Sequence, residues 1–169
     1  MLKNPIGINV LEAARQRIAA TFDDFERIYL SFSAGKDSTI MLHLVADEAR
    51  KRGRKFGIML VDLEAQYAMT MDHAKICVDQ YKDVADIYWV CLPIHLRNAV
   101  SVYEPFWMCW DPDVKDAWVR EMPEGAIGDE GYFPFFHKGM EFEEFVPAFG
   151  EWYAEGQPCA CFVGIRTDE

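Results

Sequence analysis

A short run of small, polar and charged residues has the composition of a phosphate-binding loop: Ser31-Phe32-Ser33-Ala34-Gly35-Lys36-Asp37-Ser38-Thr39. The apolar stretch 27–32 predicts a buried strand, and the residues after the run predict a helix. A helix that begins directly after a strand leaves its first backbone N–H groups unpaired, and these groups and the helix dipole attract anions. Gly35 lets a phosphate approach closely, Lys36 adds a positive charge, and the hydroxyls of Ser33, Ser38 and Thr39 add donors. The predicted chemistry is therefore binding of a nucleotide phosphate.

The spacing of this run excludes two common phosphate loops. A Walker-type loop needs a glycine five residues before Gly35 and a serine or threonine after the lysine, but Leu30 and Asp37 hold these positions. A dinucleotide loop needs the pattern Gly-x-Gly-x-x-Gly, and Gly35 is the single glycine between Gly7 and Gly53. The loop must therefore belong to another class.

The run Ser33-Ala34-Gly35-Lys36-Asp37-Ser38 resembles the PP-loop of the adenine-nucleotide α-hydrolase superfamily, Ser-Gly-Gly-x-Asp-Ser, and departs from it at Ala34. Other stretches resemble the phosphoadenosine-phosphosulfate-reductase-like branch of that superfamily; they are 38–44, 61–66, 88–93 and 164–169, the last with a Gly-x-Arg motif. The segments 9–15 and 107–112 are similar to the phosphoadenosine phosphosulfate sulfotransferase-like proteins of the immunoglobulin-binding-regulator A type. Those proteins continue well past the Gly-x-Arg motif, so the chain resembles their N-terminal half.

The resemblance implies an adenine nucleotide as ligand, either ATP or a sulfonucleotide similar to phosphoadenosine phosphosulfate (PAPS), together with Mg²⁺. The implied reaction is ATP-dependent adenylyl chemistry, as in PP-loop ATP pyrophosphatases, or sulfonucleotide transfer, as in PAPS reductase-like and sulfotransferase-like enzymes. It also implies that Lys36 and Arg166 are catalytic. The implied nucleotide-binding residues are Ser31, Ser33, Ala34, Gly35, Lys36, Asp37, Ser38, Thr39, Asp62, Glu64, Gly164 and Arg166.

Several of these side chains also have an ordinary structural interpretation. Lys36 could be a solvated loop lysine, and Asp37 could cap its helix. Asp62 and Glu64 follow a predicted buried strand, where carboxylates could hold Mg²⁺ or the nucleoside, or could be turn residues that face water. Arg166 matches the family arginine that contacts phosphate or sulfate, for which a forked guanidinium is well suited.

A second hypothesis is a non-catalytic regulator. The subgroup that the chain resembles is associated with a ParB-like partner and with gene activation, so the domain could bind a nucleotide and act through that partner. Reduction by a thiol is not expected, because true reductases carry a C-terminal Glu-Cys-Gly-like segment that this sequence lacks. Cys159 and Cys161 lie on a predicted strand, where packing is the expected role.

The sequence stops three residues after Arg166, which leaves the strand before it without a following helix. We therefore expect an exposed apolar face, association with another copy or with a second polypeptide, and weak or absent turnover by this chain alone.

Composition and charge narrow the class of protein further. With 169 residues, 51% of them hydrophobic, the chain can form one globular domain, and no apolar run is long enough to predict a membrane helix. An odd number of cysteines, five, and no visible export signal indicate a cytoplasmic protein. The net charge is −11, and residues 121–169 contain 11 acidic and 2 basic residues, so direct binding to duplex DNA is not expected. The basic cluster 50–55 is interpreted as a helix end, with contact to nucleic acid or a partner as the alternative.

Alternating patterns predict an α/β fold in three layers, a doubly wound, mostly parallel sheet with helices on both faces. Helices are expected near 8–22, 37–52, 67–82 and 141–155, with a short helical piece near 113–121, and strands at 26–32, 56–61, 87–92 and 159–165. The segment 98–138 is expected to be irregular, and its aromatic residues at 103–110 could form a small extra core or a lid or interface. His43 is expected to be a satisfied helix residue, and no zinc site is predicted. Ligands of such a sheet bind beyond the carboxyl ends of the strands.

Overall fold

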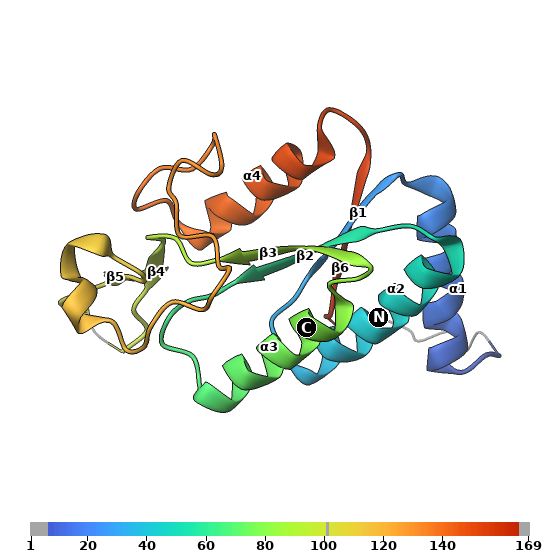
Figure 1. Ribbon diagram of the computed structural model, residues 1–169, viewed down its shortest axis with the longest axis horizontal. Coiled ribbons are helices and arrows are strands. Elements are labelled where there is room, and N and C mark those ends of the chain that lie inside the picture. The colour runs from blue at the N-terminus through green and yellow to red at the C-terminus, as the bar shows by residue number, and fades with distance from the viewer. Residues whose placement is uncertain (1–6, 101, 166–169) are drawn as a thin grey trace.

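Four parallel strands form the central sheet in the order β3-β2-β1-β6 (Figure 1). The computed structural model describes residues 7–100 and 102–165. The strands of this sheet are β1 (Arg27–Ser31), β2 (Phe56–Val61), β3 (Ala85–Val90) and β6 (Cys159–Val163). The chain moves outward from β1 through β2 to β3 and then returns to place β6 on the other side of β1. The direction of winding therefore changes between β1 and β6, which is where ligands bind in open sheets of this kind.

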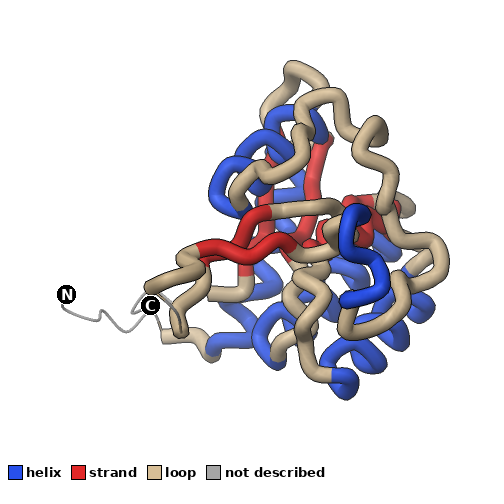
Figure 2. The backbone as a smooth tube through the Cα atoms, turned by 90° about the vertical axis from the view of Figure 1, so that its left-hand side faces the viewer, coloured by secondary structure: helices blue, strands red, loops and turns tan. Residues whose placement is uncertain are grey.

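Helices cover both faces of the sheet. On one face lie α2 (Lys36–Arg52) and α3 (Ala68–Tyr81), with α1 (Val10–Asp24) beside α2, and on the other lies α4 (Phe142–Ala154). Figure 2 shows the strands between these two layers of helices. The predicted α/β class, with a parallel sheet and helices on both faces, is confirmed.

Aromatic side chains fill the space between the sheet and α4. Tyr29 of β1 makes edge contacts with Phe149 and Tyr153 of α4, at ring-centroid distances of 5.2 and 5.3 Å. Gly57 of β2 permits this close packing, because a Cβ atom there would lie 2.9 Å from the Tyr153 ring. The buried Tyr153 hydroxyl donates a hydrogen bond to the Ile28 carbonyl at 3.0 Å, which fixes α4 to β1.

A second, antiparallel sheet corrects the sequence analysis. Its strands are β4 (His95–Arg97) and β5 (Phe106–Met108), in which Leu96 faces Trp107, and a 3₁₀-helix η1 (Pro112–Ala117) follows. Part of the segment expected to be irregular is therefore strand. The predicted third strand, 87–92, is also two residues late, because the ladder with β2 runs from Ala85 to Val90.

The first turn of α1 is exposed, and its buried face begins further along the helix. Val10 is 87% exposed and Leu11 is also exposed, whereas Ala13, Ile18 and Phe22 are buried. Among the described residues, no helix combines the length and the apolar character needed to cross a bilayer.

The basic cluster 50–55 ties α2 to its neighbours. Arg50 pairs with Asp83, and Arg52 pairs with Asp23 and Glu48. Gly53 is the C-cap of α2 in the left-handed conformation, with φ +61°. The cations therefore have local partners, which supports the interpretation of this cluster as a helix end.

Candidate functional site

The loop between β1 and α2 forms an open helix N-terminus at the carboxyl edge of the sheet. Ala34 adopts a left-handed conformation with φ +57°, and Gly35 is the N-cap of α2 without a side-chain hydrogen bond to the helix. The first backbone N–H groups of α2, those of Lys36, Asp37 and Ser38, have no helical partner by the geometry of a helix start. They therefore form an anion-binding arrangement at the positive end of the helix dipole.

Hydroxyl groups hold this loop in shape. The Ser38 hydroxyl donates to the Gly35 carbonyl at 3.0 Å and lies 3.1 Å from the Ser33 hydroxyl. The Thr39 hydroxyl bonds to the same Gly35 carbonyl at 2.8 Å. Ser38 is itself buried, so these hydrogen bonds stiffen the inner side of the loop.

The charged side chains of the loop are accessible. The Lys36 side chain is 82% exposed, and its ammonium lies 3.6 Å from the carboxylate of Asp37, which is also exposed. An exposed pair at this distance contributes little to stability. The Lys36 ammonium can therefore turn toward an anion bound at the helix start.

His73 of α3 is a contact of the loop that the sequence analysis missed. Its Nε2 lies 3.0 Å from the Thr39 hydroxyl oxygen. The Thr39 hydroxyl therefore lies between the Gly35 carbonyl and the His73 ring, whose Nε2 is also 3.5 Å from the Cys77 sulfur. No local spacing signals this contact, since the two residues lie on different helices.

Gly164 brings the end of β6 against the same helix start. A Cβ atom at Gly164 would lie 2.8 Å from the Ser38 nitrogen and 3.0 Å from its Cα, closer than side chains approach backbone. The sequence analysis assigned Gly164 to the site, and the structure brings it together with the loop at the point where the winding of the sheet changes. Ser31, another predicted site residue, is the last residue of β1 and pairs with Met59 and Val163. Arg166 was also predicted to belong to the site, and it lies outside the described residues.

The Asp62 carboxylate is buried, with 1% of the residue exposed, and both of its oxygens accept hydrogen bonds. Oδ2 accepts from the Trp89 indole at 2.9 Å, and Oδ1 accepts from the Glu64 backbone N–H at 2.9 Å. Oδ1 also accepts from Arg120, which forms an ion pair with Asp62. The interpretation of Asp62 as a turn residue facing water is therefore wrong.

Glu64 has an equally structural environment. Its Oε2 accepts from the Trp110 backbone N–H at 2.6 Å, and its Oε1 accepts from the Val119 backbone N–H at 3.0 Å. Glu64 and Trp110 both adopt positive φ angles, +63° and +51°, which are uncommon for residues other than glycine. The carboxylate thus fixes the segment after β5 to the end of β2, and Glu64 does not face water either.

A protein-bound metal is not favoured by these contacts. The two carboxylates at the strand end are occupied by N–H donors, and across residues 7–100 and 102–165 no three His, Cys, Asp or Glu side chains are grouped for metal binding. Asp37 is the accessible carboxylate beside the loop. The chain therefore offers Mg²⁺ little beyond what nucleotide phosphates would bring themselves.

The cysteine thiols are poor nucleophiles. Burial raises the pKa of the Cys109 thiol to about 11. It raises the pKa of the Cys77, Cys91 and Cys159 thiols as well. Cys161 is not buried on its strand as expected, because β6 lies at the edge of the sheet and the residue is exposed. A raised pKa disfavours the thiolate, which is the form in which a cysteine acts as a nucleophile.

One part of the aromatic segment 103–110 is buried and another part is exposed. Cys109 and Trp110 are buried, and the Trp110 indole packs edge-on against Trp118 at 5.1 Å. Tyr103 is 94% exposed, and Phe106 is also exposed. The end of the segment is thus core, whereas its beginning presents apolar surface to solvent.

Comparison with known proteins adds one relative. No protein-family model matches the chain. The chain is 45% identical over 168 residues to an uncharacterized protein, YbdN, of Escherichia coli. This match covers 99% of the chain and 41% of the relative, so the chain spans less than half the length of that protein.

Proposed function

We propose that the chain binds the phosphates of an adenine nucleotide at the loop 33–39. The observation that carries this proposal is the open start of α2, which has no side-chain cap, lies at the winding change of the sheet and is approached by Gly164. The Lys36 ammonium adds an accessible charge beside it. Backbone N–H groups at a helix start suit a phosphate chain, and the resemblance of the loop to PP-loops favours ATP or a PAPS-like sulfonucleotide.

The residues of the chain would act on the nucleotide by electrostatics. In adenylyl chemistry, ATP is cleaved between its α and β phosphates, and the N–H groups and Lys36 stabilise the negative charge on the departing pyrophosphate. In sulfonucleotide transfer, the same groups hold the phosphates while the sulfuryl group moves to an acceptor. Mg²⁺ would arrive with the phosphates and share their charge. Arg166 stays a predicted contact to phosphate or sulfate.

The test is calorimetry with ATP and with PAPS on the wild type and on Lys36→Ala. Loss of one charge-assisted contact is expected to cost about 1.5–3 kcal/mol, which is roughly a tenfold to hundredfold loss of affinity. Lys75→Ala is the matched control, since Lys75 is an exposed lysine of α3 outside the loop. Equal affinities for wild type and Lys36→Ala would remove the assignment.

A regulatory role is the second candidate, supported by the apolar surface near β5. Val100 and Val102 are largely exposed, like Tyr103, which suits contact with a protein such as a ParB-like partner. Release of AMP and pyrophosphate, or of adenosine 3′,5′-bisphosphate from PAPS, distinguishes the two roles. Turnover with purified chain supports an enzyme, whereas nucleotide binding without turnover, with and without a partner, supports a regulator.

A further inference from the structure

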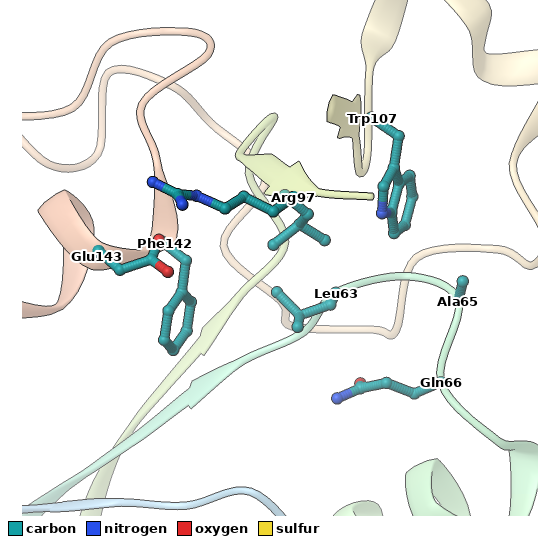
Figure 3. A pocket seen from close by; sticks show the side chains of 8 residues that line it. Leu63, Ala65, Gln66, Arg97, Trp107, Phe142 and Glu143 are labelled. Carbon is teal, nitrogen blue, oxygen red and sulfur yellow. The ribbon is translucent and has the colours of Figure 1, made fainter. Parts of the chain in front are cut away.

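A hollow lies at the carboxyl end of β2. This strand is the neighbour of β1, which leads into the loop 33–39. The volume of the hollow is about 430 Å³, and it is bounded by the residues after β2, by the β4–β5 sheet and by the start of α4 (Figure 3). Leu63, Leu96, Trp107 and Phe142 supply its apolar and aromatic lining. A hollow of this size and character can take a small organic molecule.

A buried polar atom without a partner lies in the lining. Gln66 Oε1 is buried and has no hydrogen-bond partner, the one such side-chain atom in the part of the chain that the structure describes. Buried polar atoms are nearly always hydrogen-bonded, because an unsatisfied one costs about 1–3 kcal/mol. Figure 3 shows the Gln66 side chain below the segment from Leu63 to Ala65. Because Oε1 has almost no exposed surface, the amide must turn toward the hollow before an N–H group of a ligand can supply the missing donor.

Charges of both signs border the hollow. Arg97 projects from β4 with 76% of its side chain exposed, and its nearest carboxylate, Glu141, lies 3.9 Å away, a distance at which an exposed pair contributes little. Glu143, in the first turn of α4, brings an exposed carboxylate to the same border. Figure 3 shows Arg97 and Glu143 on one side of the hollow and Trp107 on the other. A cation and an anion side by side fit a zwitterion better than a simple anion.

We propose that this hollow binds a free α-amino acid whose side chain donates an N–H group. The carboxylate of the ligand pairs with Arg97, its ammonium group pairs with Glu143, its side chain packs on Trp107 and Phe142, and its N–H group bonds to Gln66 Oε1. A second step rests on the proposed function: in adenylyl chemistry this amino acid is the acceptor, so that a carboxylate oxygen forms a bond to the α-phosphorus of ATP, the bond from that phosphorus to the bridging oxygen breaks, and pyrophosphate leaves. The hollow and the loop suit such a step because β1 and β2 are parallel neighbours and end at the same edge of the sheet. Binding in the hollow itself does not depend on the nucleotide.

The experiment is an NMR titration of ¹⁵N-labelled protein without nucleotide. The probes are L-tryptophan, L-histidine and L-glutamine, and the signals are the indole N–H of Trp107 and the side-chain amide of Gln66. At least one probe is expected to shift both signals in a saturable way, with a Kd on the order of 1 mM or tighter for a ligand of this size. Arg97→Gln is expected to weaken binding about tenfold, and Arg15→Gln, which changes an exposed arginine of α1, is the matched control.

Ligand analogues test each contact on the unchanged protein. If L-tryptophan binds, 1-methyl-L-tryptophan lacks the ring N–H, tryptamine lacks the carboxylate, and indole-3-propionate lacks the amine; each is expected to bind about tenfold more weakly. Gln66→Leu is expected to abolish the difference between L-tryptophan and its 1-methyl derivative. The proposal is overturned if none of the three amino acids shifts both signals, if the analogues of a binding amino acid bind as tightly as it does, or if Arg97→Gln changes nothing. Because ATP is absent, these results are independent of the Lys36→Ala test.

Discussion

Replacing Gly164 by alanine tests whether the end of β6 and the start of α2 form one site. The new Cβ would lie 2.8 Å from the Ser38 nitrogen, about 0.6 Å short of the 3.4 Å at which ordinary contact begins. It would also lie 3.1 Å from the Asp37 carbonyl carbon. Both contacts are to backbone, which cannot rotate away as a side chain can. Relief must therefore come from a shift between β6 and the first turn of α2.

The expected effect has two parts. Forcing an extra methyl group into a closely packed contact costs about 1–3 kcal/mol, so we expect a loss of that size in the free energy of unfolding. Because the contact involves the backbone of Asp37 and Ser38, the N–H groups proposed to hold phosphate shift as well. We therefore expect ATP affinity to fall at least about tenfold, which corresponds to ~1.4 kcal/mol.

The assays are urea denaturation and calorimetry with ATP on the same preparations. Gly131→Ala is the matched control, because its Cβ would meet the side chain of Asp129, an exposed residue that can turn aside. Wild-type stability together with wild-type ATP affinity in Gly164→Ala would refute the close approach. Lower stability with unchanged affinity would refute the link between Gly164 and the phosphate site.

Three further predictions concern the buried contacts and the surface charge. Glu64→Gln replaces one acceptor oxygen by an NH₂ group that faces the backbone N–H of Trp110 or Val119. The free energy of unfolding, measured by urea denaturation, should therefore fall by about 1–3 kcal/mol. Glu121→Gln, at an exposed position, should change it little in the same assay. The Cys109 pKa is raised by burial from 9.0 to about 11, so between these pH values the unfolded chain loses a proton that the folded chain keeps, and stability falls as pH rises. Cys109→Ala should remove about 2–3 kcal/mol of that decline, and an unchanged pH profile would contradict the burial of this thiol. The isolated chain, with its net charge of −11, should not shift duplex DNA in an electrophoretic assay at physiological salt, and a sub-micromolar shift would show the opposite.

Elements with a clear local period were predicted well from the sequence. The helix 37–52 and the strand 56–61 match α2 and β2 closely. The run 56–61 is apolar and is followed by turn residues, which is the usual pattern of a buried strand. The third strand was displaced because Cys91 and Leu92 are as apolar as the strand before them, although they lie beyond its ladder with β2. β4 and β5 have three residues each, too few to show a period, and the sequence gives no sign of their pairing.

The carboxylates at the end of β2 show why site residues are harder to predict than strands. Their position after a buried strand suggested a ligand site, yet apart from the Glu64 backbone N–H, which bonds to Asp62, their hydrogen-bond partners lie 27 to 58 residues further along the chain. Such partners are set by the tertiary fold and leave no local pattern. A charge taken from water needs compensating donors, and here N–H groups of β3 and of the segment 98–138 provide them. Because Asp62 and Glu64 hold that segment in place, the proposed binding of a nucleotide phosphate would depend on main-chain N–H groups and Lys36. That dependence makes the loop, rather than the acidic strand end, the place where substitutions should first affect a bound nucleotide.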